Sequence, residues 1–335
     1  MDLLGDKIPK PKDKVLWIRY WAFGDVLQAA AEAQQFKAIF PDVHLTFLTK
    51  PLYADLIKEQ PWCDDVIAGD KRPMSAFKET LSNIRGRNFD WVISLNHGGH
   101  TALMCCLSGI KNRVGTVSCF PFAYNESLEH FYSRIGISTT VRSQAVISVS
   151  SNTYSIAGNL LSALPKRKVA AIIGASCDDK RWPLEHWVVF LSKVLQENWG
   201  VVLVGSGSEE KCFSARLKKE LDHPLVCDLT GELSIKELAG VISRCDIAVG
   251  NDTGPLHLAA LSGVPTIGIA DYDQFKKIGL DLPWFSGLSA ASGLDFAKSG
   301  KRSKKLLSGI SPEKVWSIFS LYKERAELSK IRLSK

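Results

Sequence analysis

The sequence of 335 residues lacks the long apolar runs that mark membrane-spanning helices. No stretch reaches the roughly 18 consecutive apolar residues that are needed to cross a bilayer. The N-terminal segment Met1–Lys14 is charged and interrupted by proline, so it does not contain the hydrophobic region of a signal peptide. These two absences predict a cytoplasmic protein.

Cysteine pairs at metal-binding spacing are also missing. The eight cysteines include no Cys-x-x-Cys pair, which argues against a structural zinc site. Most of them lie in apolar stretches, where a free thiol behaves as a small hydrophobic side chain. We therefore expect reduced, buried cysteines.

Two further motifs are absent. No expected strand is followed by Gly-x-Gly-x-x-Gly, which makes an NAD-dependent oxidoreductase a poor interpretation. No recognition motif or aromatic-rich basic repeat accompanies the net charge of +7, so we expect no nucleic-acid partner. The positive excess suits an anionic substrate or an anionic lipid surface, although solvated lysines would also account for it. Basic residues gather at Lys166–Lys168, at Lys298–Lys305 and in the tail after Lys323.

The sequence does contain an alternation of short apolar strands and amphipathic helices, which is typical of parallel α/β folds. The alternation occurs twice, and the length of the chain also suggests two domains. Apolar runs of this kind suit strands that are buried on both faces of a sheet. In the first half we expect strands at Val15–Arg19, His44–Leu48 and Trp91–Leu95, and a helix at Asp25–Ile39.

The second half repeats the pattern after Leu164–Lys168, where a proline and charged residues indicate a linker. We expect strands at Val169–Ile173, Val201–Val204, Ile247–Gly250 and Thr266–Ile269, with helices from Pro183, Glu209, Gly254 and Pro312. The predicted fold is α/β, with two Rossmann-like doubly wound domains at 1–164 and 165–335 that face a central cleft. The terminal helix could pack back on the N-terminal domain. Ligands of such sheets bind at the carboxyl ends of the strands.

The strongest functional segment is Val249–Ala260. A strand ends at Gly250, a tight polar turn follows, and Pro255 favours the first turn of a helix. Free backbone N–H groups at the helix start, together with the helix dipole, form an anion site suited to a diphosphate. Asp252 would repel a phosphate, so we expect it to accept hydrogen bonds from sugar hydroxyls. The alternative is that Asp252 or Thr253 only caps the helix.

Asp252–Ala260, followed by Gly263–Ile269, closely resembles the signature of the lipopolysaccharide heptosyltransferase family. Further segments resemble motifs of that family in the same order: Arg19–Val26, Gly174–Pro183, Val204–Glu210 and Asp228–Gly231. The resemblance implies the GT-B fold and inverting transfer from ADP-heptose without a metal or other cofactor. The first half departs more from the family pattern, because relatives carry a proline in the helix after Asp25 and lack an N-terminal extension.

Inverting transfer needs a base that removes the proton of the acceptor hydroxyl as this hydroxyl attacks. Asp25, after the first strand, is the candidate, although an aspartate there could also cap the helix. Lys180 could neutralise the charge that develops on the leaving diphosphate, unless it is only a solvated lysine. Glu210, or its neighbour Glu209, could accept hydrogen bonds from the ribose.

The donor-binding set implied by the resemblance combines backbone and side-chain contacts. The turn Thr253–Leu256 should present its backbone to the diphosphate. His257 could hold a phosphate oxygen or a sugar hydroxyl, or it could be a buried structural histidine. The full set is Gly24, Ser176, Glu210, Thr230, Asp252, Thr253, Gly254, Pro255, Leu256 and His257.

The acceptor side is less defined. The segment Asn96–His100 follows a strand and could be a polar loop near the acceptor, an inert turn, or a zinc site that lacks further ligands nearby. Asp271–Asp273 looks like an Asp-x-Asp metal motif, but its place late in the second half argues against that role. The acceptor candidates are Asn96, His97, His100, Lys71, Arg72 and Arg113.

The resemblance implies a heptosyltransferase that uses ADP-heptose and acts on the inner core of lipopolysaccharide, an anionic acceptor built from the acidic sugar Kdo and heptose. It would work in the cytoplasm, at or near the cytoplasmic face of the inner membrane, with a possible peripheral contact to that anionic surface. The alternatives are an enzyme of the same fold with another nucleotide sugar or acceptor, and a non-catalytic relative that binds nucleotide sugars or glycans.

Overall fold

The computed structural model describes residues 7–140, 145–175, 180–270, 280–289 and 307–333. Contacts divide the chain into two compact units, Met1–Thr139 and Thr140–Lys335. Each unit contains one six-stranded sheet in which all paired strands are parallel. No helix among the described residues is both long and apolar enough to cross a membrane.

The first unit is built around a sheet with the strand order β3-β2-β1-β4-β5-β6. Its apolar strands are buried on both faces, as the sequence predicts for a sheet that is covered by helices on each side. The elements are β1 (Lys14–Ile18), α1 (Phe23–Ile39), β2 (His44–Thr49), α2 (Pro51–Lys58), β3 (Asp65–Ala68), α3 (Met74–Gly86), β4 (Trp91–Ser94), α4 (Gly99–Leu107), β5 (Asn112–Gly115), β6 (Glu126–Ser127) and α5 (Leu128–Ile135).

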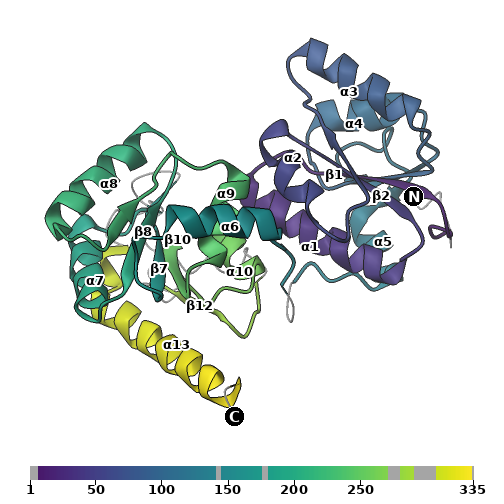
Figure 1. Ribbon diagram of the computed structural model, residues 1–335. Helices are drawn as coiled ribbons and strands as arrows, with labels where there is room; N and C mark the ends of the chain where they lie inside the picture. Colours follow the sequence, from purple (N-terminus) through teal and green to yellow (C-terminus); the bar gives the residue numbers. More distant parts are fainter. Residues whose placement is uncertain (1–6, 141–144, 176–179, 271–279, 290–306, 334–335) are drawn as a thin grey trace, which may run out of the picture. The chain divides into compact units, whose positions relative to one another are not determined.

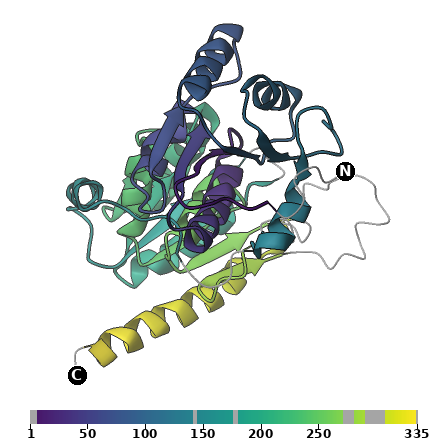
Figure 2. The same ribbon diagram turned by 90° about the vertical axis from the view of Figure 1, so that its right-hand side faces the viewer.

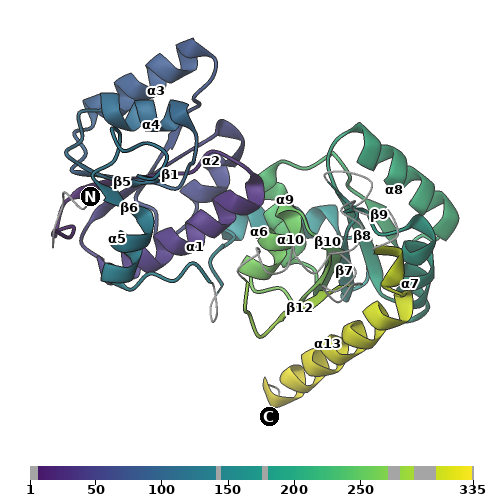
Figure 3. The same cartoon turned by 180° about the vertical axis from the view of Figure 1, so that it is seen from behind.

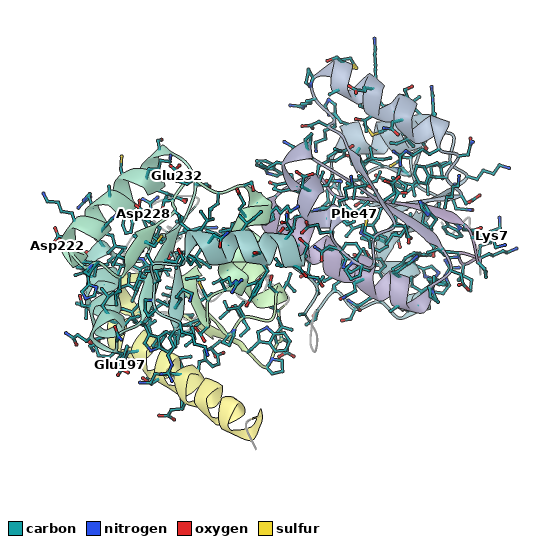
Figure 4. The ribbon with its side chains drawn as sticks, viewed as in Figure 1. Lys7, Phe47, Glu197, Asp222, Asp228 and Glu232 are labelled. Carbon is teal, nitrogen blue, oxygen red and sulfur yellow. The ribbon has the colours of Figure 1, made fainter. Side chains whose placement is uncertain are left out.

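Helices cover both faces of this sheet (Figures 1 and 3). Alternate residues of the central strands face opposite sides of the sheet. On one face, Trp17 of β1 packs against Phe36 of α1 and Tyr132 of α5. On the other face, residues of α3 and α4 join the cluster that contains Leu16 and Ile18. Phe47 of β2, labelled in Figure 4, packs against Trp62 inside this unit.

The second unit has the strand order β12-β11-β10-β7-β8-β9. One face of its sheet carries a large aromatic cluster in which Trp182, Trp187, Phe190 and Phe319 meet edge to face. The elements are α6 (Ser151–Leu160), β7 (Lys168–Ile172), α7 (Leu184–Gln196), β8 (Gly200–Val204), α8 (Ser208–Leu221), β9 (Val226–Asp228), α9 (Ile235–Ser243), β10 (Ile247–Asn251), α10 (Gly254–Leu261), β11 (Thr266–Ile269), β12 (Phe285–Leu288), a 3-10 turn (Leu307–Gly309) and α13 (Pro312–Leu333).

The C-terminal helix α13 is one uninterrupted element (Figures 1 and 2). It packs against α7, β10 and β11 within the second unit. Phe319 of α13 anchors this contact by packing against Phe190 and Trp199. The terminal helix therefore completes the core of its own unit.

The two sheets share one topology. When the strands of each unit are numbered from its own start, both sheets have the order 3-2-1-4-5-6. In that order the chain reverses direction across the sheet between the first and fourth strands, and ligands of such folds bind there, beyond the carboxyl ends of the strands. Ligand sites are therefore expected beyond the carboxyl ends of β1 and β4 in the first unit and of β7 and β10 in the second unit.

The division between the units falls after Thr139, whereas the sequence suggested a boundary after residue 164. Two contacts explain the difference. The N–H groups of Val146 and Ile147 donate to the carbonyl of Leu261 in the second unit. Helix α6 also packs closely on α9, where a Cβ atom on Gly240 would lie 2.9 Å from the carbonyl oxygen of Thr153.

The expectation that the cysteines are buried is only partly correct. The seven described cysteines are free thiols, and Cys105 and Cys245 are buried. Cys106, Cys119 and Cys212 are exposed. Cys106 and Cys212 lie on helices that are covered by the sheet on one side only, so apolar neighbours in sequence did not guarantee burial.

Candidate active site

The turn between β10 and α10 is tied to the loop after β7 by one side chain. Asn251 is fully buried at the end of β10. Its amide nitrogen donates to the carbonyls of Ile173 (3.2 Å) and Gly174 (3.0 Å), and its Oδ1 accepts the N–H of Trp182 at 3.0 Å. Asn251 therefore fixes the segment that carries Lys180 relative to the start of α10.

The start of α10 offers two unused amides. The N–H groups of Leu256 and His257 donate to the carbonyl of Thr253, and Pro255 has no N–H. The N–H groups of Thr253 and Gly254 donate to no atom of the described residues. The sequence predicts that the backbone from Thr253 to Leu256 faces a diphosphate. Within that turn, these two amides remain available to an anion.

Asp252 and His257 contact each other across this turn. Nε2 of His257 lies 3.2 Å from Oδ1 of Asp252, and both side chains are largely buried. Nδ1 of His257 is buried and has no partner among the described residues. The pair is thus held in place at the start of α10, with one buried ring nitrogen that has no hydrogen-bond partner among the described residues.

Lys180 stands beside a firmly anchored tryptophan. Trp182 is fully buried, and its indole N–H donates to the carbonyl of Ile310 at 2.8 Å. Its ring packs edge to face against Trp187 and His186. Nζ of Lys180 makes no hydrogen bond or ion pair within the described part of the chain. Because its ammonium group is unpaired and its neighbour Trp182 is anchored, Lys180 is suited to bind an anionic ligand.

Glu210 of α8 reaches back over the ends of β7 and β8. Its carboxylate accepts the N–H of Ala175 at 3.1 Å and the N–H of Ser206 at 2.5 Å. A Cβ atom on Gly205 would lie 2.5 Å from its Oε2, so a side chain at position 205 would displace the carboxylate. Burial raises the pKa of Glu210, while these two amides and Arg181 oppose the rise.

The structure distinguishes Glu210 from its neighbour Glu209. Glu209 is exposed, and its carboxylate lies 3.7 Å from Arg181. Thr230 is near Glu210, because both approach the same glycine, Gly205. The hydroxyl of Thr230 is buried and has no partner in the described residues. Glu210 and Thr230 therefore form the polar group at this edge.

In the first unit, Asp25 lies in the first turn of α1, after Gly24. Its Oδ2 lies 2.6 Å from Nη2 of Arg19 and accepts the N–H of Ala22 at 2.9 Å. The guanidinium of Arg19 also donates to the carbonyl of Leu95. Oδ1 of Asp25 has no partner among the described residues, and the side chain is 55% exposed. Asp25 thus both caps the helix and keeps one free oxygen.

The loop after β4 contains both internal and exposed polar groups. The buried amide of Asn96 donates to the carbonyl of Ile18 (3.3 Å) and accepts the N–H of Tyr20 (3.4 Å). His97 is exposed and lies 2.9 Å from the hydroxyl of Thr116. His100 is exposed at the start of α4. Asn96 therefore holds β4 to the loop after β1, and the two histidines remain at the surface.

Cations gather at the same edge. Nζ of Lys71 lies 5.8 Å from the centre of the Tyr20 ring, and Arg72 is exposed beside it. Burial lowers the pKa of Lys71, and Lys50, Arg72 and Arg19 lower it further, while Asp70 opposes them. Such a field attracts an anionic ligand.

Arg113 is not part of this group. It lies within β5, and its guanidinium donates to the carbonyls of Ala123 and Ile110, both at 2.7 Å. Two other predicted elements, Ser176 and Asp271–Asp273, lie outside the described residues. Within the described residues there is no group of three or more His, Cys, Asp or Glu side chains that could hold a metal ion.

Residues 126–304 match the model of glycosyltransferase family 9 (heptosyltransferase). This match covers more than half of the sequence. The chain belongs to glycosyltransferase family 9. It is therefore an enzyme of the heptosyltransferase kind.

This family 9 glycosyltransferase is 21% identical to the lipopolysaccharide core heptosyltransferase OpsX of Haemophilus influenzae over 275 residues, which cover 76% of this chain and 78% of OpsX. Among solved structures, it resembles a family 9 glycosyltransferase from Veillonella parvula, with a TM-score of 0.81, 18% identity and coverage of 94% and 98% of the two chains. It also resembles Escherichia coli ADP-heptose lps heptosyltransferase II, with a TM-score of 0.77, 17% identity and coverage of 94% and 99%. The predicted α/β fold with two Rossmann-like sheets is confirmed.

Sequence reasoning about this glycosyltransferase missed three residues at the two edges: Arg19, Lys50 and Asn251. Each follows or ends an expected strand, so a search for polar side chains at strand ends would have found them. Their contacts were not readable from the sequence, because each binds a residue that is distant in the chain: Leu95, Asp70 and Trp182, respectively.

Proposed function

We propose that the chain transfers heptose from ADP-heptose to the Kdo/heptose inner core of lipopolysaccharide, with inversion at the anomeric carbon and without a metal. The second unit would bind the donor and the first unit the acceptor. Relatives named as a lipopolysaccharide core heptosyltransferase and as a lipopolysaccharide heptosyltransferase support this assignment. The work would take place on the cytoplasmic side of the inner membrane, where the acceptor precursor is presented.

The observation that carries the proposal is the anion site of the second unit. The two free amides at the start of α10 and the unpaired Lys180 lie on two segments that the side chain of Asn251 ties together. Together they would bind the diphosphate and stabilise the charge that develops on it as it leaves. This fixed positive charge would serve the purpose that a metal ion serves in other transferases.

The rest of the donor would meet side chains at the same edge. Glu210 in the first turn of α8 and Thr230 after β9 are suited to ribose hydroxyls, since the Glu210 carboxylate keeps lone pairs beyond those that accept its two backbone N–H groups. Asp252 and His257 would orient the heptose through the carboxylate and the free Nδ1. Ser176 belongs to this proposal as an additional donor contact.

Asp25 would act as the general base. The acceptor hydroxyl attacks the anomeric carbon, its proton passes to Oδ1 of Asp25, and the bond between the anomeric carbon and the diphosphate oxygen breaks. ADP leaves with the electron pair of that bond. Lys71, Arg72 and the loop with His97 and His100 would meet the phosphates and carboxylates of the acceptor, which are charges of the opposite sign.

Calorimetric titration in a chelating buffer tests the donor assignment. ADP and ADP-heptose should bind without metal and more tightly than UDP or GDP. A transfer assay with ADP-heptose and a Kdo-containing acceptor should then give the inverted product. Preference for UDP or GDP would exclude the donor assignment, and binding without transfer would leave a non-catalytic relative.

A further inference from the structure

The first unit exposes an unusual set of apolar side chains. Among the described residues, the four most exposed large hydrophobic side chains are Leu52 (62%), Met74 (61%), Phe122 (61%) and Trp21 (60%), and the next one reaches 51%. Single exposed apolar residues are ordinary on protein surfaces. Several such side chains in one unit indicate an interaction surface only if they lie close together.

The four residues share one edge of the sheet. Trp21 follows β1, Leu52 lies in the first turn of α2 after β2, Met74 begins α3 after β3, and Phe122 follows β5. The strands β1, β2 and β3 run parallel, so the segments that follow them emerge at the same edge. Phe122 lies in the connection from β5 to β6, and its contact with Phe120 joins it to this edge. We name these four residues the apolar rim.

Contacts between neighbouring loops show that this edge is continuous. Nζ of Lys50 lies over the ring of Trp21, 4.6 Å from its centre. Nζ of Lys71 contacts the loop after β4, where a Cβ atom on Gly98 would lie 3.6 Å from it. A Cβ atom on Gly99 would lie 3.5 Å from Phe120, and the ring of Phe120 packs edge to face against Phe122.

The rim is interleaved with positive charge. Lys50, Lys71 and Arg72 come from the same loops. Two acidic residues lie at this edge: Asp70, which is 3.6 Å from Lys50, and Asp25, which is paired with Arg19. A positive excess therefore remains beside the apolar side chains. Exposed tryptophan, leucine and phenylalanine flanked by Lys and Arg are the combination that binds at the headgroup level of anionic bilayers.

We propose that the apolar rim is a peripheral membrane-contact surface for an anionic bilayer. The four side chains would enter the interfacial layer, and Lys50, Lys71 and Arg72 would lie against lipid phosphates. Trp21 is close in sequence to Asp25, so the contact would bring lipid-anchored acceptor to the base. That last step rests on the proposed function, whereas the binding of vesicles does not.

Co-sedimentation with vesicles tests the surface directly. The full chain should bind vesicles of phosphatidylethanolamine and phosphatidylglycerol and should not bind phosphatidylcholine vesicles. The double variant Leu52→Ser/Met74→Ser should lose at least 10-fold in binding, and Trp21→Ser/Phe122→Ser should lose as much. The matched control is Val189→Ser/Leu321→Ser, which removes exposed apolar side chains from the second unit and should bind as the unchanged protein does.

Melting temperatures of the variants should match that of the unchanged chain, since all substituted side chains are exposed. Transfer to a water-soluble acceptor fragment should be unaffected in Leu52→Ser/Met74→Ser, whereas transfer to vesicle-bound acceptor should fall. Failure of the chain to bind anionic vesicles, or equal binding by the rim variants, would overturn the proposal. Concentration-dependent dimerisation lost in the rim variants, without vesicle binding, would assign the rim to a second copy instead. Loss of transfer with vesicle binding intact would refute only the proposed function.

Discussion

At the scale of single residues, the two oxygens of Asp25 differ in what they can do. Oδ2 is held by Arg19 and by the N–H of Ala22, and Oδ1 is unoccupied in the described structure. If Oδ1 takes the proton of the acceptor, Asp25→Asn should lower kcat by roughly 10²–10⁴-fold, the usual loss for a general base. Steady-state kinetics measures this effect, and ADP titration of the variant should give an unchanged Kd. Turnover at the original rate would remove Asp25 from the mechanism.

Arg19 positions this carboxylate without contacting the reacting atoms in the proposed mechanism. Its guanidinium binds both Asp25 and the carbonyl of Leu95, which a lysine cannot reproduce with the same geometry. Arg19→Lys should therefore lower kcat by about 10–100-fold, the scale of small displacements of a reacting group, with little change in the KM for the donor. Added guanidinium ion should partly restore kcat in Arg19→Ala. A change in KM alone would argue against positioning.

Buried Glu32 of α1 makes stability depend on pH. Burial raises its pKa to about 7, against the opposing effects of the Tyr132 hydroxyl, Arg19 and Gln28. The native chain thus retains a proton between pH 4.5 and 7 that the unfolded chain releases, so stability falls as the pH rises through this window. Glu32→Gln cannot ionise and can still accept the hydrogen bond of Tyr132. Its unfolding free energy relative to the unchanged chain should rise by on the order of 2–3 kcal/mol from pH 5 to pH 8. A constant difference in denaturant titrations would contradict this.

At the scale of secondary-structure elements, Asn251 connects three segments: β10, the end of β7 and the loop at Trp182. Asn251→Ala leaves a buried N–H and two carbonyls without this partner, which should cost about 1–3 kcal/mol of unfolding free energy. It should also weaken ADP binding, because the loop that carries Lys180 is no longer tied to the start of α10. Lys180→Ala is the matched comparison: it should weaken ADP binding at unchanged stability. Equal stability of both variants would mean that the hydrogen bonds of the Asn251 side chain make no net contribution to the free energy of unfolding.

The elements and their order were readable from the sequence because each strand is a short apolar run and each following helix is amphipathic. The segment at Asp252 was readable as a turn before a helix. What the sequence did not show is how side chains are shared between segments. Glu210 binds two backbone amides of separate loops, and Arg113 binds carbonyls around β5, so each is partly or wholly committed internally. The unit boundary was also missed, since the contact of α6 with α9 is formed only in the folded state.

At the scale of the whole molecule, the two units repeat one design. Each sheet changes direction between its first and fourth strands, and at each change a buried asparagine binds the loop after the first strand. In the first unit this residue is Asn96, and in the second it is Asn251. The same topology therefore rigidifies both edges, while the side chains around them differ: a carboxylate with a free oxygen in one, and free amides with an ammonium group in the other.

This difference predicts that the two units respond unequally to ADP. At a free concentration of 100 times its Kd, ADP should stabilise the unit that binds it by about 2.7 kcal/mol. Hydrogen exchange should slow at 180–182 and 251–257, where amides would be covered or held, and stay unchanged along β2 and β3. In the first unit, by contrast, the carboxylate of Asp25 lies at the start of α1, where its negative charge opposes the binding of a diphosphate. Protection centred on residues 19–25 would place ADP in the first unit and reverse the assignment of donor and acceptor sides.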